Sequence, residues 1–120
     1  MIRSYKDLEV CKRAYMLSLE IHKLSMDFPK YEMFELGAQI RRSTKSIVMN
    51  IAEGYGKKHS AAEFKRYLSI AIGSADEVKV QLEYCKDLGY VSEANYQRYS
   101  EGYTEVAKML TGLYNNWKEI

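Results

Sequence analysis

The chain has 120 residues, of which 47% are apolar and 28% are charged, and its formal net charge is +2. This composition fits one globular domain over residues 1–120, and it excludes a disordered chain and a pair of full-sized domains. No apolar run approaches the roughly 18 residues that span a bilayer, and the first residues lack the apolar stretch of a signal peptide. We therefore expect a cytoplasmic protein with no membrane partner.

The first predicted helix begins near Ser4, where Ser4-x-x-Asp7 matches a capping box. Its apolar residues follow one another in steps of four and three, which is the spacing of a heptad seam. They are Val10, Ala14, Leu17, Ile21, Leu24 and Phe28. Pro29 ends this helix, because proline lacks a backbone N–H and disfavours helix in the residue before it.

The second predicted helix begins between Met33 and Leu36 and ends at Gly54-Tyr55-Gly56. We expect a glycine there to take the left-handed conformation that often terminates a helix. The apolar stripe of this helix consists of Leu36, Ile40, Ile47, Val48 and Ile51.

Two further helices are predicted from a second capping box, Ser60-x-x-Glu63, to Gly89 and from Ser92 to the end of the chain. Their apolar seams are Phe64, Leu68, Ala71, Ala75, Val78, Leu82 and Cys85, and then Tyr96, Tyr99, Tyr103, Val106, Leu110, Leu113 and Trp117. Because the connections are short, neighbouring helices must be antiparallel. The sequence therefore predicts an all-α protein, an antiparallel up-down-up-down four-helix bundle.

Residues that carry chemistry in helical bundles are missing from the expected spacings. Di-metal bundles need Glu-x-x-His pairs, but Leu19 and Gly56 stand three residues before His22 and His59, the two histidines. The cysteines, Cys11 and Cys85, form no metal-binding pattern, and we expect both thiols to be buried and inert. We predict that the protein is not an enzyme and uses neither a metal nor a cofactor.

The charge is unevenly distributed along the chain. Residues 38–66 carry a net charge of +5, whereas the rest of the chain carries −3. A solvated helical face would explain this asymmetry, and so would a surface for nucleic-acid phosphates. The candidate phosphate-contacting residues are Arg41, Lys45, Lys57, Lys58, Lys65 and Arg66. We expect Arg41 and Lys45 in particular to be exposed.

A ridge of polar side chains follows one side of the second predicted helix. The polar ridge comprises Gln39, Arg42, Ser46, Asn50 and Glu53, which lie within an arc of about 80° at 100° per residue. Two explanations remain open. The ridge is either a structural network, in which Arg42 pairs with Glu53 or with groups on another helix or subunit, or a surface that contacts a ligand.

Three glycines lie inside the last two predicted helices, where each lowers helix stability. We expect Gly73, Gly102 and Gly112 to lie where another helix approaches closely, from this chain or from a second subunit.

Several short motifs together resemble the four-helix-bundle family encoded in intervening sequences of bacterial 23S ribosomal RNA genes. The motifs are Asp7-Leu8-Glu9-Val10, Phe28-Pro29, Gln39-Ile40-Arg41-Arg42, Ser46-Ile47, Asn50-Ile51-Ala52-Glu53-Gly54 and Leu88-Gly89-Tyr90. The chain is also similar to the accessory proteins of diversity-generating retroelements, which bind a reverse transcriptase and nucleic acid. The resemblance implies a bundle that assembles with itself into a homopentameric ring.

Two functions follow as hypotheses. In the first, a homo-oligomeric ring binds RNA or DNA without regard to sequence through its basic surface. In the second, the ring is a scaffold that recruits a protein partner, such as a reverse transcriptase, and has no direct role in nucleic-acid binding.

Overall fold

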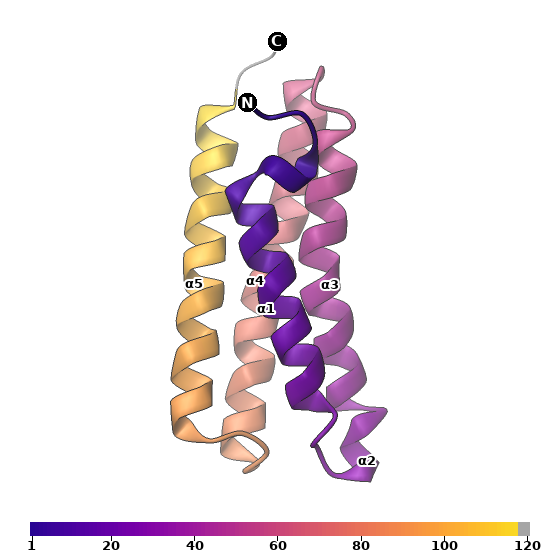
Figure 1. Ribbon diagram of the computed structural model, residues 1–120, viewed down its shortest axis with the longest axis vertical. Coiled ribbons are helices and arrows are strands. Elements are labelled where there is room, and N and C mark those ends of the chain that lie inside the picture. Colours follow the sequence, from indigo (N-terminus) through magenta and orange to yellow (C-terminus); the bar gives the residue numbers. More distant parts are fainter. Residues whose placement is uncertain (118–120) are drawn as a thin grey trace.

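The computed structural model describes residues 1–117 and contains four long helices that pack side by side. They are α1 (Glu9–Ser25), α3 (Leu36–Tyr55), α4 (Ala61–Asp87) and α5 (Glu93–Asn116), with two short helices, η1 (Tyr5–Asp7) and α2 (Lys30–Met33). Consecutive long helices run in opposite directions, and the bundle measures 48 × 23 × 22 Å (Figure 1). Residues 1–117 contain no strand, so the predicted all-α four-helix bundle is confirmed.

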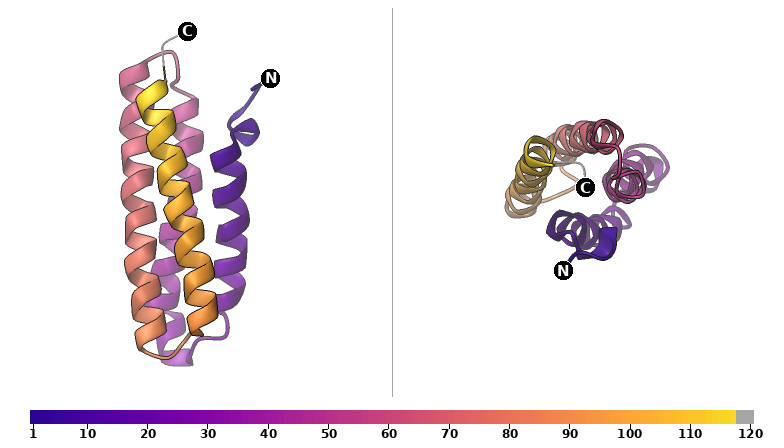
Figure 2. Two further views of the ribbon diagram at one scale, coloured as in Figure 1. Left: turned by 90° about the vertical axis from the view of Figure 1, so that its left-hand side faces the viewer. Right: turned by 90° about the horizontal axis from the view of Figure 1, so that it is seen from above.

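The long helices follow one another around the bundle in the order α1, α3, α4 and α5 (Figure 2). Each helix therefore packs against two neighbours, and α1 and α4 lie on a diagonal. This arrangement gives the bundle four faces, each formed by one pair of neighbouring helices. Two of these faces, the one between α3 and α4 and the one between α1 and α5, differ in how their charges are satisfied.

The predicted seams form most of the core of the bundle, although Leu24, Tyr96 and Leu113 are only half-buried. All seven seam residues of α4, from Phe64 to Cys85, are fully buried. Tyr99 and Tyr103 of α5 are buried as well, with 6% and 0% of their surfaces exposed, so these tyrosines belong to the core. Burial of one apolar stripe per helix supplies most of the stability of such a bundle.

The capping box at Ser4 is confirmed, but it caps η1 and not α1. The carboxylate of Asp7 accepts the N–H groups of Arg3 at 2.8 Å and Ser4 at 3.2 Å, and these bonds lower the pKa of Asp7. Leu8 is then extended, with ψ at 124°, so α1 begins only at Glu9. The prediction of one continuous helix from Ser4 is therefore wrong.

The other predicted helix ends agree better with the structure. Ser60 and Ser92 are N-caps, and their hydroxyls accept the N–H groups of Glu63 at 3.2 Å and Asn95 at 3.1 Å. The first long helix ends at Ser25, three residues before the predicted end. A turn then leads into α2, for which Pro29 is the N-cap.

Three glycines lie at or near the ends of α3 and α4. Gly56 has φ of −63°, so the predicted left-handed cap at the end of α3 is wrong. Gly54 is needed for another reason, because a Cβ there would lie 2.7 Å from Cβ of Tyr67 where α3 and α4 touch. At the end of α4, Gly89 has φ of +81° and closes the helix as predicted.

Among the mid-helix glycines, Gly102 alone lies at a close contact within the described chain. A Cβ at Gly102 would lie 3.1 Å from Cδ2 of Leu17, where α5 meets α1. A Cβ at Gly73 or Gly112 would meet no atom within 4 Å. For these last two positions, an approach by a second subunit stays a prediction.

Candidate functional sites

Four of the predicted phosphate-contacting residues gather where α3 gives way to α4. Lys57 and Lys58 follow the end of α3, and Lys65 and Arg66 lie in the first two turns of α4. We call these four residues the basic end. Figure 1 shows that the connection between α3 and α4 lies at the same end of the bundle as the N-terminus.

Aromatic rings hold the cations of the basic end in place. Tyr67, which is 9% exposed, has Lys57 Nζ 5.1 Å and Arg66 Cζ 4.5 Å from its ring centroid. The ammonium of Lys57 also donates to the Tyr67 hydroxyl at 3.2 Å, and this bond raises the pKa of Lys57. Both cations are therefore charged at neutral pH and lie against one buried ring. Arg66 also pairs with Glu63 at 3.1 Å, so this guanidinium already has an anionic partner.

The two remaining lysines of the basic end have their own rings. Lys58 Nζ lies 4.0 Å from the ring centroid of Tyr55, and Lys65 Nζ lies 5.5 Å from that of Tyr114. A contact with a ring face leaves the N–H donors of an ammonium available to an outside oxygen. The basic end thus presents positioned cations that still have hydrogen-bonding capacity.

The other two predicted phosphate-contacting residues lie elsewhere. Arg41 donates to Ser25 Oγ and to the Met33 carbonyl, both at 2.7 Å, so it joins the ends of α1 and α2 to α3. It is half-buried, and the prediction that Arg41 is exposed is wrong. Lys45 is exposed, with Nζ 3.3 Å from Nδ1 of His22. Ten residues of helix, about 15 Å, separate Lys45 from Tyr55 at the end of α3, so the six residues do not form one surface.

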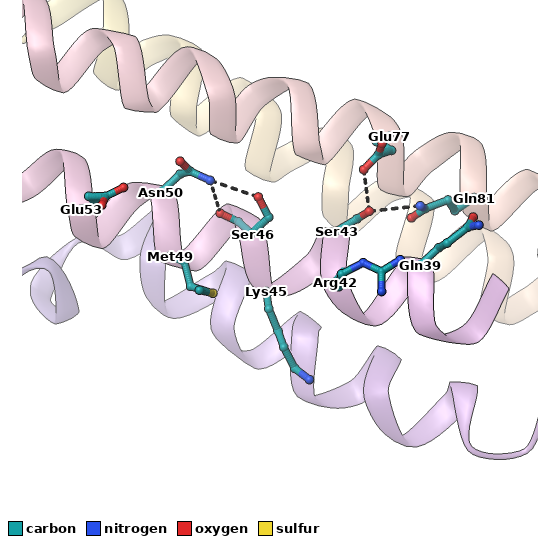
Figure 3. A pocket seen from close by; sticks show the side chains of 10 residues that line it. All are labelled: Gln39, Arg42, Ser43, Lys45, Ser46, Met49, Asn50, Glu53, Glu77 and Gln81. Atoms are coloured by element: carbon teal, nitrogen blue, oxygen red, sulfur yellow. Dashed lines mark hydrogen bonds between the residues drawn. The ribbon is translucent and has the colours of Figure 1, made fainter. Parts of the chain in front are cut away.

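The polar ridge forms one wall of a groove of about 760 Å³ between α3 and α4 (Figure 3). All five predicted ridge residues line this groove. Lys45, predicted as a phosphate contact, also lines the groove, and the sequence interpretation missed the residues that complete it, which are Ser43, Met49, Glu77 and Gln81. Two of these, Glu77 and Gln81, lie four residues apart on α4, a spacing that places them on one side of a helix.

Hydrogen bonds join the two walls of the groove. Ser46 Oγ lies 3.0 Å from Ser74 Oγ of α4, and Asn50 donates to the Ser46 hydroxyl at 3.0 Å. Ser43 donates to Glu77 at 2.6 Å and accepts from the Gln81 amide at 3.0 Å. Of the ridge residues, Ser46 therefore bonds across to α4 and Asn50 bonds to Ser46 within α3, and both explanations of the ridge stay predictions.

The predicted pairing of Arg42 with Glu53 does not occur. The two residues are eleven positions apart on α3, about 16 Å along the helix. No ion pair within residues 1–117 involves Arg42, Glu53 or Glu77. The buried Oε1 atom of Gln81, at the inner side of the groove, also lacks a hydrogen-bond partner in this part of the chain. The groove thus carries one buried oxygen without a partner in this part of the chain, and three exposed charges without an ion pair there.

We next consider whether the described residues could hold a metal ion or supply a reactive thiol. Residues 1–117 contain no group of three histidine, cysteine or acidic side chains that could hold a metal ion. Both thiols are buried, as predicted, and burial raises the pKa of Cys11 and raises that of Cys85 to about 12. Neither thiol is therefore ionised at neutral pH. No helix in the described part of the chain is both long and apolar enough to cross a membrane.

The fold and its two surfaces define a small helical-bundle protein with a basic end and a polar groove. We compared the sequence with models of known protein families. The family model described as 23S rRNA-intervening sequence protein matches residues 6–112, so the chain belongs to that family. The family resemblance drawn from the sequence motifs is thereby confirmed.

The fold is also found among solved structures. One of them is the crystal structure of a protein with unknown function from the S23 ribosomal protein family of Bacteroides thetaiotaomicron. The two chains are 28% identical with a TM-score of 0.83, and the match covers 92% of this chain and 99% of that one. A comparison with curated proteins gives no match.

Proposed function

We propose that this protein is a non-enzymatic homo-oligomer, a pentameric ring, that binds RNA or DNA through the basic end of each subunit. The single observation that carries the nucleic-acid part is the set of four cations held on aromatic rings at one end of the bundle. Positioned ammonium and guanidinium groups suit phosphate oxygens, and neighbouring tyrosines suit unpaired bases. The assembly part rests on the family resemblance and on the groove, whose charges form no ion pair within residues 1–117.

Assembly would make a modest basic patch effective. Each phosphate that is neutralised releases counterions, so affinity rises with the number of phosphates bound and falls with salt. One subunit offers four cations, and a ring would repeat them around its axis. The described residues include no motif that reads base edges in a groove, so we expect binding that does not depend on sequence.

Titration of a labelled structured RNA and of a matched DNA duplex, across about 50 to 300 mM salt, tests the proposal. The variant replaces three lysines of the basic end, Lys57→Gln, Lys58→Gln and Lys65→Gln. We expect at least about tenfold weaker binding at low salt, and a salt slope flatter by about one unit for each phosphate that the variant no longer neutralises.

A matched control removes the same charge from another part of the surface. Lys30→Gln, Lys79→Gln and Lys108→Gln change three lysines outside the basic end and the groove. Equal losses of affinity in the two variants would mean that only net charge matters. Absence of binding by the wild-type protein at 50 mM salt would overturn the nucleic-acid proposal.

The second candidate function is a scaffold for a protein partner, and a feature of the opposite end favours it. Tyr31 and Phe34, which lie within and just after α2, are 72% and 79% exposed, and Tyr84 and Leu88 near the end of α4 are 60% and 52% exposed. Exposed aromatic residues of this kind are common in protein interfaces. Binding of a partner that survives nuclease treatment and is abolished in a Phe34→Ser variant would support the scaffold.

A further inference from the structure

The charges of the α3–α4 groove have no ion-pair partner within residues 1–117. Glu53 lies at one end of the groove, and Glu77 and Arg42 lie toward the other. Lys45 turns away from them toward α1 of its own chain, where its Nζ lies 3.3 Å from His22 (Figure 3). An exposed charge needs no partner, so the question is whether another surface of this chain carries the opposite charges in the same arrangement.

The outward side of α1 carries such a surface. Lys12, Met16, Leu19 and Lys23 follow one another in steps of four, three and four, which places them in one stripe along the helix. We call these four residues the α1 stripe. Its two lysines bracket two apolar side chains, and Met16 and Leu19 are 55% and 41% exposed. Asp27, also exposed, follows just beyond the end of α1.

The stripe and the groove lie at the same height along the bundle. The contact between His22 and Lys45 fixes how α1 and α3 are aligned, and the two helices are antiparallel. From that contact, Lys12 lies ten residues, about 15 Å, along α1, and Glu53 lies eight residues, about 12 Å, in the same direction along α3. Lys12 and Glu53 therefore differ in height by only about 3 Å.

The stripe and the groove are also aligned toward the other end of the groove, where Glu77 and Arg42 lie. Lys23 lies one residue beyond His22, and Ser43, which donates to Glu77 at 2.6 Å, lies two residues beyond Lys45. Lys23 and Glu77 are thus at nearly the same height. Asp27 and Arg42 lie further in this direction, five residues beyond His22 and three beyond Lys45.

The charges along the two surfaces are complementary in order. From Lys12 to Asp27, the side of α1 presents a positive, a positive and a negative group, and the groove presents a negative, a negative and a positive group at matching heights. Lys12 pairs with Glu9 of its own helix at 3.3 Å, and docking would exchange this exposed pair for one with the neighbour. No ion pair within residues 1–117 joins the stripe to the groove. The stripe lies on the opposite side of α1 from its buried residues, and α4, which carries Glu77, lies across a diagonal of the bundle from α1 (Figure 2).

We propose that the α1 stripe of one copy docks into the α3–α4 groove of the next copy. Lys12 would then pair with the neighbour's Glu53, Lys23 with its Glu77 and Asp27 with its Arg42. Met16 and Leu19 would cover the neighbour's Met49, which is 67% exposed in the groove. This inference rests on the proposed homo-oligomer and names the surfaces that build it.

The equal heights also determine the kind of assembly. Docking uses two different surfaces of the same chain, so the contact is heterologous. A heterologous contact gives a closed ring when the copies are related by rotation alone, and a filament when each step also adds a translation. Because stripe and groove lie at one height, rotation about an axis parallel to the bundle brings them together.

Charge reversal on the stripe tests the docking. In Lys12→Glu/Lys23→Glu, both introduced carboxylates would repel the neighbour's carboxylates, and we expect at least about tenfold weaker association by sedimentation or light scattering. Adding Glu53→Lys and Glu77→Lys to the same chain should restore assembly. The control, Lys79→Glu/Lys108→Glu, makes the same charge change away from both surfaces and should assemble as the wild type does.

A second pair of variants does not depend on charge. Leu19→Arg places a large side chain in the centre of the stripe, whereas Val80→Arg changes an apolar residue of α4 that is 51% exposed and does not line the groove. We expect Leu19→Arg alone to dissociate the oligomer, with both variants folded by circular dichroism.

The outcomes separate this inference from the proposed function. A monomeric wild-type protein would overturn the proposed assembly and the docking with it. An oligomeric wild type whose Lys12→Glu/Lys23→Glu and Leu19→Arg variants assemble normally would overturn the docking while the assembly stands. Dissociation that the added Glu53→Lys/Glu77→Lys pair fails to reverse would overturn the pairing of these residues.

Discussion

Two faces of the same bundle satisfy their charges in different ways. On the α1–α5 face, Arg98 pairs with Glu20 at 2.7 Å and Arg13 pairs with Glu105 at 3.7 Å. On the α3–α4 face, Arg42, Glu53 and Glu77 line a groove and form no ion pair within residues 1–117. This difference teaches that the number of charges on a face does not by itself identify an interaction surface. Whether those charges find partners within the chain is the more informative property.

The polar contacts of the two faces also differ in how deeply they are buried. Beneath the groove, Gln81 is 9% exposed and bonds to Ser43 across the two helices. On the α1–α5 face, by contrast, the ion pairs are open to solvent, with 65% of the Arg98 side chain exposed. Substitutions under the groove should therefore have larger effects on stability than substitutions of the exposed pairs.

The largest expected effect compares the glycines at which each pair of helices touches. Gly54→Ala would place a Cβ 2.7 Å from Cβ of Tyr67, which is fixed to the backbone, so α3 and α4 must separate. Gly102→Ala would meet the end of the flexible Leu17 side chain at 3.1 Å. We expect Gly54→Ala to lower the free energy of unfolding by about 1–3 kcal/mol and Gly102→Ala by less, measured by urea denaturation. Equal losses would contradict the account of tight α3–α4 packing.

The next effect concerns the polar network under the groove. Ser43→Ala would leave the Gln81 amide and the Glu77 carboxylate without their shared hydroxyl. Because Gln81 is buried, we expect a loss of about 1–2 kcal/mol in the free energy of unfolding. The same denaturation measurement on Ser100→Ala, a half-buried serine of α5, serves as the control and should change little.

A stabilising change is expected at the two open glycines. Gly73→Ala and Gly112→Ala each introduce a Cβ that meets no atom within 4 Å, so only helix propensity changes. Each should raise the free energy of unfolding by up to about 1 kcal/mol. Destabilisation by either substitution, in a thermal or urea unfolding experiment, would show that its site is occupied by a contact outside the described chain.

The smallest expected effect is on the α1–α5 face. Arg98→Ala removes an exposed ion pair with Glu20, which should lower the free energy of unfolding by less than about 1 kcal/mol. The loss should shrink further in high salt, because exposed charges are screened. If Arg98→Ala lowered the free energy of unfolding as much as Ser43→Ala does, the two faces would not differ as we describe.

Local patterns were sufficient to predict much of this molecule. The heptad steps identified most of the buried residues, because helical periodicity depends only on positions near one another in the chain. They did not mark Leu8, Tyr55 and Tyr67, which are buried as well. The 100° rotation per residue likewise placed Gln39, Arg42, Ser46, Asn50 and Glu53 on one side of α3, and all five line the groove. The N-caps Ser60 and Ser92 were predictable for the same local reason.

Features that depend on the alignment of separate helices were not predictable. The wall formed by Glu77 and Gln81 faces the ridge because α3 and α4 meet at Gly54 and Tyr67, which no local pattern reveals. The half-burial of Arg41 depends on where α1 ends and on the Met33 carbonyl. Its charge pointed to an exposed surface, but its position at the junction of three helices makes it a structural residue.

Cross-linking through designed cysteines tests the difference between the two faces most directly. Lys23→Cys/Glu77→Cys places one thiol on the stripe and one in the groove, and the natural cysteines, Cys11 and Cys85, are buried. Under mild oxidation, the account predicts disulfides between chains in a ladder that ends at five copies of the 14.0 kDa chain. A control with the second cysteine on the α1–α5 face, Lys23→Cys/Glu105→Cys, should give little cross-linking. Equal cross-linking of both variants, or none in either, would contradict the claim that the α3–α4 face is where a second copy binds.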